Sequence, residues 1–279
     1  MAERSVFISK PYYPFFEEIR VQLDWFSGFA LSQKRKCEIG LHKNFLNCYP
    51  GHRVLEVSSS SLNELGYRLS AMNLKKNTAQ GMTTVESAFQ SSRVYMDEDR
   101  QIGPFPEYLF LAGWECKKHV KAISKGLHSY QYEYEGYTFY APDFHVSLFY
   151  DFLYLNALLE KENQEITKGL LEGKYSAFTD LATTSLNSQA RSCAIFAGLA
   201  EVGLTDEIKD VDRYLTLFRT TPDGKALGEV SYENVQLRVK GKVHLLSPVI
   251  SNTFPRTNVD QYYKAHYSHL SNKKGNKGR

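Results

Sequence analysis

Residues 144–162 read FHVSLFYDFLYLNALLEKE, a stretch that is apolar on almost every side of a helix before its charged end. A helix that is apolar all round is buried among other elements, whereas a surface helix carries a single apolar stripe. We therefore expect a buried central helix here. Its notable polar interruptions are Tyr150, Asp151 and Asn156.

The segments on either side of this stretch carry signals of their own. Residues 130–141, YQYEYEGYTFYA, alternate aromatic and polar side chains around Glu135-Gly136, which is typical of two strands joined by a tight turn. Residues 185–204, SLNSQARSCAIFAGLAEVGL, predict a helix with Asn187 as its N-cap and Gly203 at its end. Small residues at helical spacing on that segment predict close packing against a neighbouring element.

Residues 83–100, TTVESAFQSSRVYMDEDR, open with a Thr-x-x-Glu pattern that predicts a helix beginning at Thr83. Offsets of four and seven then place Glu86, Gln90 and Arg93 on one helical face, so that an acid, an amide and a cation point together. The alternative is that Glu86 only closes a capping box with Thr83 and that Arg93 is a solvated surface cation.

Length and composition fit one large domain with an appendage. The chain has 279 residues, of which 42% are hydrophobic and 14% aromatic, so it can bury a sizeable core. Alternating residues over 228–250, around Lys240-Gly241, predict a second β-ribbon. We predict a mainly helical α+β domain with a small β-hairpin over residues 1–220, and a C-terminal extension over residues 221–279 with a β-ribbon and a basic tail. That tail is either a solvated segment or a contact for nucleic-acid phosphates.

Several function classes lack their signatures. No apolar run is long enough to span a membrane and the N-terminus lacks the layout of a secretory signal, so a cytoplasmic protein is expected. The four cysteines show no CxxC spacing and the histidines no metal-ligand spacing, which predicts no metal site. GxGxxG, P-loop and GxSxG motifs are missing, so no cofactor is expected. A net charge of +3 neither demands nor excludes a nucleic-acid partner.

Further polar and aromatic residues are candidates for ligand contact. Residues 65–74, LGYRLSAMNL, contain Ser70 and Asn73 among apolar side chains, where they could bind sugar hydroxyls or cap a turn. Aromatic rings could stack on a base, although most of them belong to the core or the surface. The rings considered for stacking are Tyr95, Tyr108, Trp114 and Tyr150.

Five strings taken together resemble the NADAR superfamily, and within it the branch of antitoxins paired with DarT-type DNA ADP-ribosylating toxins. They follow the family's order and cover most of residues 1–215. The strings are WFSGFALSQKRKCEIGLH from Trp25, LEVSSSSLNELGYRLSAMNL from Leu55, TTVESAFQSSRVY from Thr83, FYDFLYLNAL from Phe149 and AFTDLATTSLNSQARSCAIFAGL from Ala177.

The resemblance implies an N-glycosidase with a mostly helical domain and a deep nucleotide cleft. Members of the branch are thought to hydrolyse the bond between ADP-ribose and guanine, whereas other members act on phosphorylated intermediates of riboflavin synthesis. It places Glu86 at the family's central acidic position and Asp180 near a second one. Cleaving an N-glycosidic bond builds positive charge on the ribose, which a carboxylate can stabilise, and the leaving nitrogen needs a proton.

The proton donor and the phosphate contacts are less sharply defined. Asp180 is preferred over Asp151 as donor, since a carboxylate inside an apolar helix more often bonds to Arg or backbone. The phosphates of ADP-ribose would meet the N-terminus of the helix from Ser188, with Arg191 one turn in, and Arg93 could share that task. The candidate catalytic residues are Glu86, Asp180 and Arg93, and the candidate substrate-binding residues are Ser70, Asn73, Gln90, Tyr150, Asp151, Asn187 and Arg191.

The leading hypothesis is an ADP-ribosylguanine glycohydrolase that reverses a toxin's mark on DNA, as a cognate antitoxin or a phage counter-defence enzyme. Its expected partners are ADP-ribosylated guanine in single-stranded DNA, ADP-ribose and a DarT-type toxin, with no membrane contact. One alternative is an N-glycosidase acting on a free phosphorylated nucleotide. The other is a non-enzymatic antitoxin that binds toxin or modified DNA.

Overall fold

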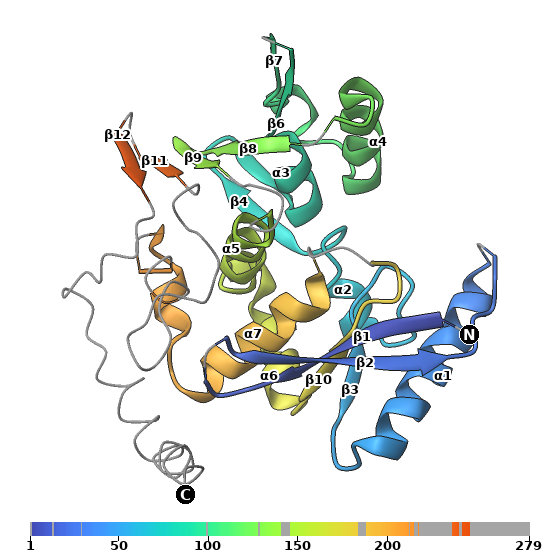
Figure 1. Cartoon of the computed structure of the whole chain (residues 1–279). Helices are drawn as coiled ribbons and strands as arrows, with labels where there is room; N and C mark the ends of the chain where they lie inside the picture. The colour runs from blue at the N-terminus through green and yellow to red at the C-terminus, as the bar shows by residue number, and fades with distance from the viewer. Residues whose placement is uncertain are drawn as a thin grey trace, which may run out of the picture.

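Helices and strands are mixed along the described residues (Figure 1). The computed structural model describes residues 2–12, 14–28, 30–98, 100–127, 129–140, 146–183, 188–211, 213–214, 217, 236–239 and 242–245. Within them, the strands form a four-stranded, a six-stranded and a two-stranded sheet. The expectation of a mainly helical domain with one small hairpin is therefore wrong. The fold is mixed α/β, with which an α+β class is compatible.

The four-stranded sheet carries the N-terminal part of the chain, in the order β2-β1-β10-β3. β1 pairs antiparallel with both β2 and β10, and β10 pairs parallel with β3. Val6 and Ile8 face one side of the sheet and Phe7 the other, as the two-residue repeat of a strand requires. The bounds are β1 Ala2–Ser9, β2 Phe16–Leu23, β3 Val54–Glu56 and β10 Ala177–Thr179.

Helices cover both faces of this sheet. Leu41 and Phe45 of α1 (Leu31–Cys48) pack with Val6 and Ile8 in one apolar cluster. Phe7, on the opposite face, packs in the main core, where α7 (Gln189–Glu201) contacts β1 and β10. The predicted helix over 185–204 is thus present. Its N-cap is Ser188, and the predicted cap Asn187 lies outside the described residues.

The central helix is the strongest prediction of the sequence, and it is confirmed. α5 (Val146–Leu158) is buried on all sides and contacts α3, α7 and β4. Its fully buried residues include Leu153, Tyr154 and Leu155. Figure 1 shows it between the two larger sheets. The short helices η3 (Lys161–Asn163), α6 (Gln164–Glu172), α2 (Glu64–Arg68) and η4 (Thr205–Ile208) pack around this centre.

The six-stranded sheet is antiparallel, in the order β12-β11-β9-β8-β6-β7. Its middle is the hairpin predicted around Glu135-Gly136, which is confirmed, with φ +48° at Glu135 and +81° at Gly136. β11 and β12 also form the predicted ribbon, and β11 pairs with β9. The division at residue 220 stays a prediction. The bounds are β6 Arg93–Asp97, β7 Arg100–Ile102, β8 Ser129–Tyr134, β9 Tyr137–Tyr140, β11 Gln236–Val239 and β12 Lys242–Leu245.

The segment from Thr83 differs from its prediction. The helix α3 spans only Val85–Ser91, and its N-cap is Thr84, whose Oγ1 accepts a hydrogen bond from the Ser87 N–H. Strand pairing with β8 ends the helical run, because Arg93 and Val94 bond across to that strand. Non-local pairing therefore overrides the local helix signal. Neighbouring elements are β4 Lys75–Thr78, β5 Gly81–Thr84, η1 Pro106–Tyr108 and α4 Gly113–Ser124.

Candidate active site

Glu86 sits in the first turn of α3, and its side chain is nearly buried. The residue as a whole is 6% exposed. Its backbone N–H donates to the Ala71 carbonyl at 2.9 Å, which ties α3 to the segment after α2. The capping alternative for Glu86 is wrong, since Thr84 and Ser87 close the helix start without it. The Glu86 carboxylate is therefore available for another partner.

The three residues predicted to share a face do meet. The Gln90 Nε2 donates to Glu86 Oε1 at 3.0 Å, and Arg93 Nη1 donates to Gln90 Oε1 at 3.2 Å. Arg93 reaches this position from β6 rather than from the predicted helix. Its guanidinium lies against the rings of Phe89 and Tyr95, 5.7 and 5.3 Å from their centroids. Acid, amide and cation thus form one connected row.

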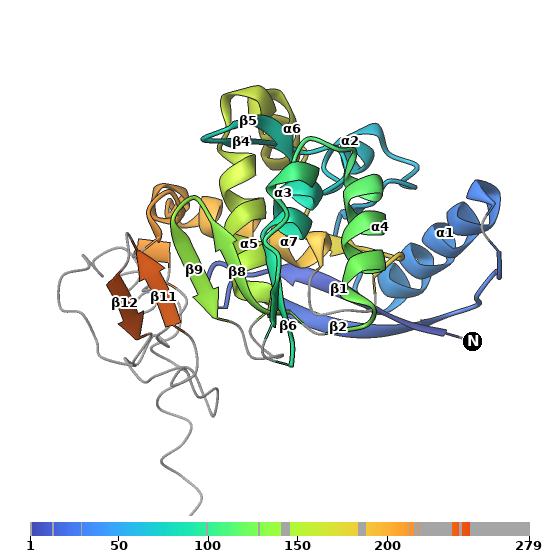
Figure 2. The same ribbon diagram turned by 90° about the horizontal axis from the view of Figure 1, so that it is seen from above.

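The helix α4 supplies a partner that the sequence did not reveal. Lys117 Nζ lies 3.3 Å from Glu86 Oε1, and its side chain is 56% exposed. Gly113 makes the approach possible, because a Cβ there would lie 2.9 Å from Glu86 Cβ and 2.9 Å from the Met72 sulfur. Figure 2 shows α4 beside α3, in agreement with their many contacts. No local pattern signals a contact between residues so far apart in sequence.

A cavity of about 470 Å³ opens beside this row. Gln90, Arg93 and Lys117 all line it, so the groups bonded to Glu86 form part of its wall. Glu86 is not among the residues that line the cavity. A ligand in the cavity would meet the amide and the two cations before it met the carboxylate.

Tyr150 links Glu86 to the other buried carboxylates. It is 5% exposed and packs edge-on against Phe89, with 5.2 Å between ring centroids. Burial raises the pKa of Tyr150 well above its usual range, and the charges of Glu86, Asp180 and Asp151 raise it further. Tyr150 thus lies within electrostatic reach of three acids and remains a neutral phenol at physiological pH.

Asp180 is buried, and no cation pairs with it among the described residues. It is 5% exposed, and neither carboxylate oxygen has a hydrogen-bond partner among the described residues. Burial raises the pKa of Asp180 to about 7, and the charge of Glu56 adds to the shift. Polar groups at Thr183, Ala182 and Gln189 offset part of it. A carboxyl group in this state holds a proton near neutral pH and can release it.

Asp180 belongs to a group of buried ionisable side chains that sequence reasoning missed. Glu56 is 1% exposed and accepts from Thr179 Oγ1 at 2.6 Å and from the Leu181 N–H at 3.0 Å. His42 Nε2 lies 2.8 Å from the same Thr179 hydroxyl, and burial lowers its pKa to about 4. A glutamate directly inside the apolar strand β3 was the one available signal.

Asp151 and Arg191 form a closed pair. Arg191 Nη2 donates to Asp151 Oδ2 at 2.9 Å, and Ser192 Oγ donates to Oδ1 at 2.6 Å. Both charged side chains are 9% exposed. Arg191 thus joins α7 to α5 within the core, and the expectation that it meets substrate phosphates stays a prediction. The bonds of Asp151 to Arg191 and Ser192 are those that a structural role requires.

Ser70 and Asn73 also satisfy each other. Ser70 is 0% exposed, and its Oγ accepts from Asn73 Nδ2 at 2.9 Å. The same amide donates to the Tyr67 carbonyl at 2.9 Å. These bonds stabilise the turn after α2, so the sugar-binding expectation has no support in the geometry. Asn187 lies outside the described residues.

The four rings considered for stacking differ in exposure. Tyr95 is 1% and Tyr150 5% exposed, so both are core residues. Tyr108 stacks on His119, with 5.1 Å between ring centroids. Trp114 is 62% exposed and follows Gly113, the residue packed against Glu86. Trp114 is therefore the candidate that a base could reach.

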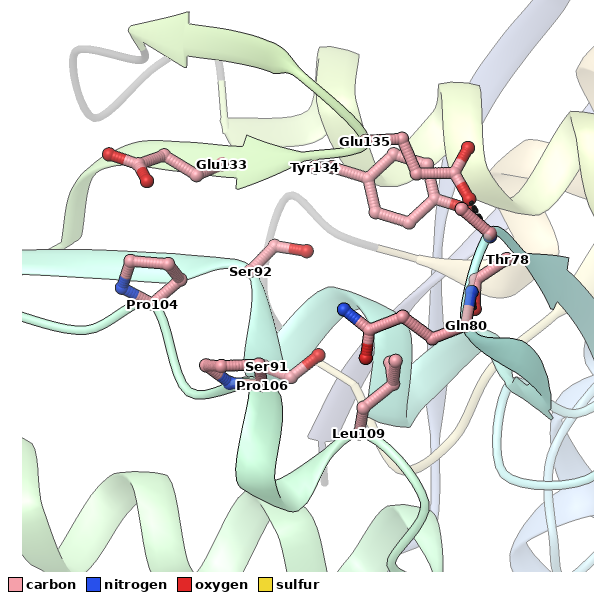
Figure 3. A pocket seen from close by; sticks show the side chains of 11 residues that line it. Thr78, Gln80, Ser91, Ser92, Pro104, Pro106, Leu109, Glu133, Tyr134 and Glu135 are labelled. Atoms are coloured by element: carbon pink, nitrogen blue, oxygen red, sulfur yellow. Dashed lines mark hydrogen bonds between the residues drawn. The ribbon is translucent and has the colours of Figure 1, made fainter.

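Two further cavities lie elsewhere. One of about 290 Å³ is lined by Leu181 and Ala182, next to Asp180, and by Trp25, over which the Arg4 guanidinium sits at 4.3 Å. The other, of about 190 Å³, is shown in Figure 3, where Gln80 points toward Ser91. None of the predicted catalytic residues lines the second cavity.

The described residues contain no group of three or more His, Cys, Asp or Glu side chains that could hold a metal ion. Among the helices of this part of the chain, none combines the length and apolar character needed to cross a membrane.

Comparison with known proteins bears on the family. No curated protein matches the chain. A family model described as the DarT1-associated NADAR antitoxin matches residues 2–226, which include Glu86, Asp180 and every element from β1 to α7. The match spans well over half of the sequence and confirms the resemblance seen in the five strings. The chain belongs to the DarT1-associated NADAR antitoxin family.

Proposed function

We propose that this protein is an N-glycosidase that hydrolyses the bond between ADP-ribose and guanine in DNA. The observation that carries the proposal is the Glu86 carboxylate, nearly buried yet bonded to Gln90 and Lys117 at the wall of a cavity. Family membership supports it, because NADAR proteins are linked to N-glycosidase activity.

Glu86 would act on the sugar. As the base departs, positive charge builds on the ribose ring, and a fixed carboxylate stabilises that charge or activates the attacking water. The Gln90 amide orients the carboxylate through its 3.0 Å bond. Lys117 neutralises it in the free protein, and its exposed side chain can turn away when the cationic sugar takes its place.

Asp180 would supply the proton to the leaving guanine nitrogen. A carboxyl group whose pKa lies at about 7 holds a proton on a substantial fraction of molecules at neutral pH. No cation pairs with Asp180 among the described residues, so its carboxyl group keeps the raised pKa of about 7. If Asp180 is the donor, the rate falls as pH rises above about 7, because the deprotonated form accumulates.

DNA is the proposed carrier of the modified base because the family is associated with DarT1. The toxin's modification and the antitoxin's hydrolysis would then be opposite reactions on the same guanine. The exposed Trp114 beside Gly113 offers a flat surface for that base or its neighbour.

The test is incubation with a single-stranded oligonucleotide carrying one ADP-ribosylated guanine, followed by mass measurement of the DNA. Wild type should restore unmodified guanine, and Glu86→Gln should lower the rate by roughly 10²- to 10⁴-fold. Glu172→Gln is the matched control, since that glutamate is exposed on α6, and it should retain full activity.

Other results would exclude the proposal. An active Glu86→Gln variant would remove Glu86 from the chemistry. If the wild type releases ribose phosphate from phosphorylated pyrimidine nucleotides and leaves the oligonucleotide unchanged, the protein is a metabolite glycosidase. If the protein binds the modified strand but does not restore unmodified guanine, it is an antitoxin that acts by binding alone.

A further inference from the structure

The surface of α4 carries a row of cations, of which Lys117 alone pairs with an acid among the described residues. Lys117, Lys121 and Lys125 follow one another at four-residue intervals, which places them along one face of α4 and its C-cap. All three are exposed, and each lines the 470 Å³ cavity beside Glu86. Fully solvated lysines usually spread over a surface, so their convergence on one hollow calls for an explanation.

Arg93 of β6 adds a fourth cation to the lining of the cavity. It is held between the rings of Phe89 and Tyr95 and by its bond to Gln90, which fixes the guanidinium in place. In the part of the chain that the structure describes, neither Arg93 nor Lys121 nor Lys125 forms an ion pair with a carboxylate. The residues lining the cavity include these four cations and no acid.

Such a cavity favours an anion. Four like charges around one hollow repel each other, and that repulsion is relieved when a multivalent anion binds between them. Planar Arg and flexible Lys side chains are the usual partners of phosphate oxygens. Ser124 and the polar Gln90 add hydrogen-bonding groups to the same wall.

We propose that Arg93, Lys117, Lys121 and Lys125 form a phosphate-binding subsite that holds the diphosphate of ADP-ribose while its ribose faces Glu86. This inference rests on the proposed function. Its geometric basis is that Lys117 borders both groups, lying 3.3 Å from the carboxylate and lining the cavity. In ADP-ribose the diphosphate is one ribose away from the carbon whose bond is cut, so adjacent sites for the two are required.

The sequence predicts phosphate binding at the N-terminus of α7, whereas this proposal assigns it to α4 and Arg93. Arg191 was expected to meet the phosphates, but its guanidinium is buried against Asp151. The proposed phosphate contact is thus the lysine row of α4 rather than the N-terminus of α7. Phosphates of the DNA strand share the same chemistry and are the other source that the experiment must distinguish.

The test measures binding without bond cleavage. Lys121→Gln/Lys125→Asn removes two charges that lie away from Glu86, and asparagine tolerates the left-handed backbone at position 125, where φ is +46°. Lys118→Gln is the matched control, because Lys118 is an exposed lysine of α4 that does not line the cavity. Calorimetry with ADP-ribose and fluorescence anisotropy with an unmodified single strand are run on each variant.

We expect the double variant to weaken ADP-ribose binding at least about tenfold and to leave strand binding unchanged, with Lys118→Gln like wild type for both probes. If only strand binding weakens, and the slope of log affinity against log salt falls by about 0.7 per lost contact, the subsite holds DNA phosphates and the diphosphate assignment is overturned. If the double variant matches Lys118→Gln, or wild type binds neither probe, the subsite does not exist. Failure of the proposed function would appear separately, as an active Glu86→Gln variant.

Discussion

Two helix contacts in this molecule are built on the same chemical pair and serve different purposes. α3 meets α4 through Glu86 and Lys117, and α5 meets α7 through Asp151 and Arg191. The two acids are equally buried, with side chains 8% and 9% exposed. Their partners are not, since Lys117 is 56% exposed and Arg191 only 9%.

This difference separates scaffold from candidate site. At α5–α7 a planar guanidinium and the Ser192 hydroxyl satisfy Asp151 from inside the core, and both members of the pair are 9% exposed. At α3–α4 the Gln90 amide donates a hydrogen bond to Glu86, and the exposed Lys117 side chain lines a cavity. Exposure of the cation, rather than of the carboxylate, is what distinguishes the two pairs, and under the proposed function a substrate would displace the exposed cation.

The largest effect should come from breaking the closed pair. Arg191→Met leaves Asp151 charged and buried without its main partner, and we expect a loss of about 3–5 kcal/mol in the free energy of unfolding, measured by urea denaturation. The double change Asp151→Leu/Arg191→Met should recover most of it, because no charge is then left unpaired. If Arg191→Met lowers the free energy of unfolding by less than about 1 kcal/mol, Asp151 does not depend on Arg191 as its buried partner.

A second prediction concerns the close approach of α4. Gly113→Ala places a methyl group against Glu86 Cβ and Met72, and the resulting shift should cost roughly 1–3 kcal/mol of stability and lower glycosidase activity. Gly40→Ala is the control, since no atom lies within 4 Å of a Cβ there and the change improves the helix α1. Equal stability of the two variants would show that Gly113 does not set the spacing.

The raised pKa of Asp180 can be tested by the dependence of stability on pH. The pKa of Asp180 is raised to about 7 in the folded protein from an ordinary value of 3.8, so the folded state binds more protons between these limits. Its contribution to stability is complete at low pH and declines, by at most about 1.4 kcal/mol per pH unit, as pH rises toward 7. Asp180→Asn should remove this decline. It should therefore be more stable than wild type at pH 8, by thermal unfolding, yet slower on the modified oligonucleotide.

The smallest effect on stability is expected at the Glu86–Lys117 pair, whose cation is exposed. Lys117→Met removes a largely exposed cation, and ion pairs of that kind contribute about 0–1 kcal/mol. Urea denaturation should therefore barely distinguish the variant from wild type, while its kcat/KM on the modified strand falls. A stability loss as large as that of Arg191→Met would erase the distinction between the two contacts.

Local patterns were sufficient for several elements. The apolar run around Leu153 predicted the buried α5, and the alternation around Glu135-Gly136 predicted the β8–β9 hairpin. The spacing of Glu86, Gln90 and Arg93 predicted that these groups meet, although a strand rather than a helix carries Arg93. The sequence of β1 and β2 also alternates, with Val6 and Ile8 and with Val21 and Leu23 on the face packed against α1.

By itself the sequence determined the family and the buried central helix, because both depend on the order and periodicity of residues along the chain. Only the tertiary structure decided the fold class, since β3 and β10 are three-residue strands that form through pairing between distant segments. The tertiary structure also decided the surroundings of the three candidate acids. Glu86, Asp151 and Asp180 look alike in sequence. What separates them is that a distant lysine pairs with the first, a distant arginine pairs with the second, and no cation of the described residues pairs with the third. Charge and solvation are set by neighbours in space, which a linear pattern does not contain.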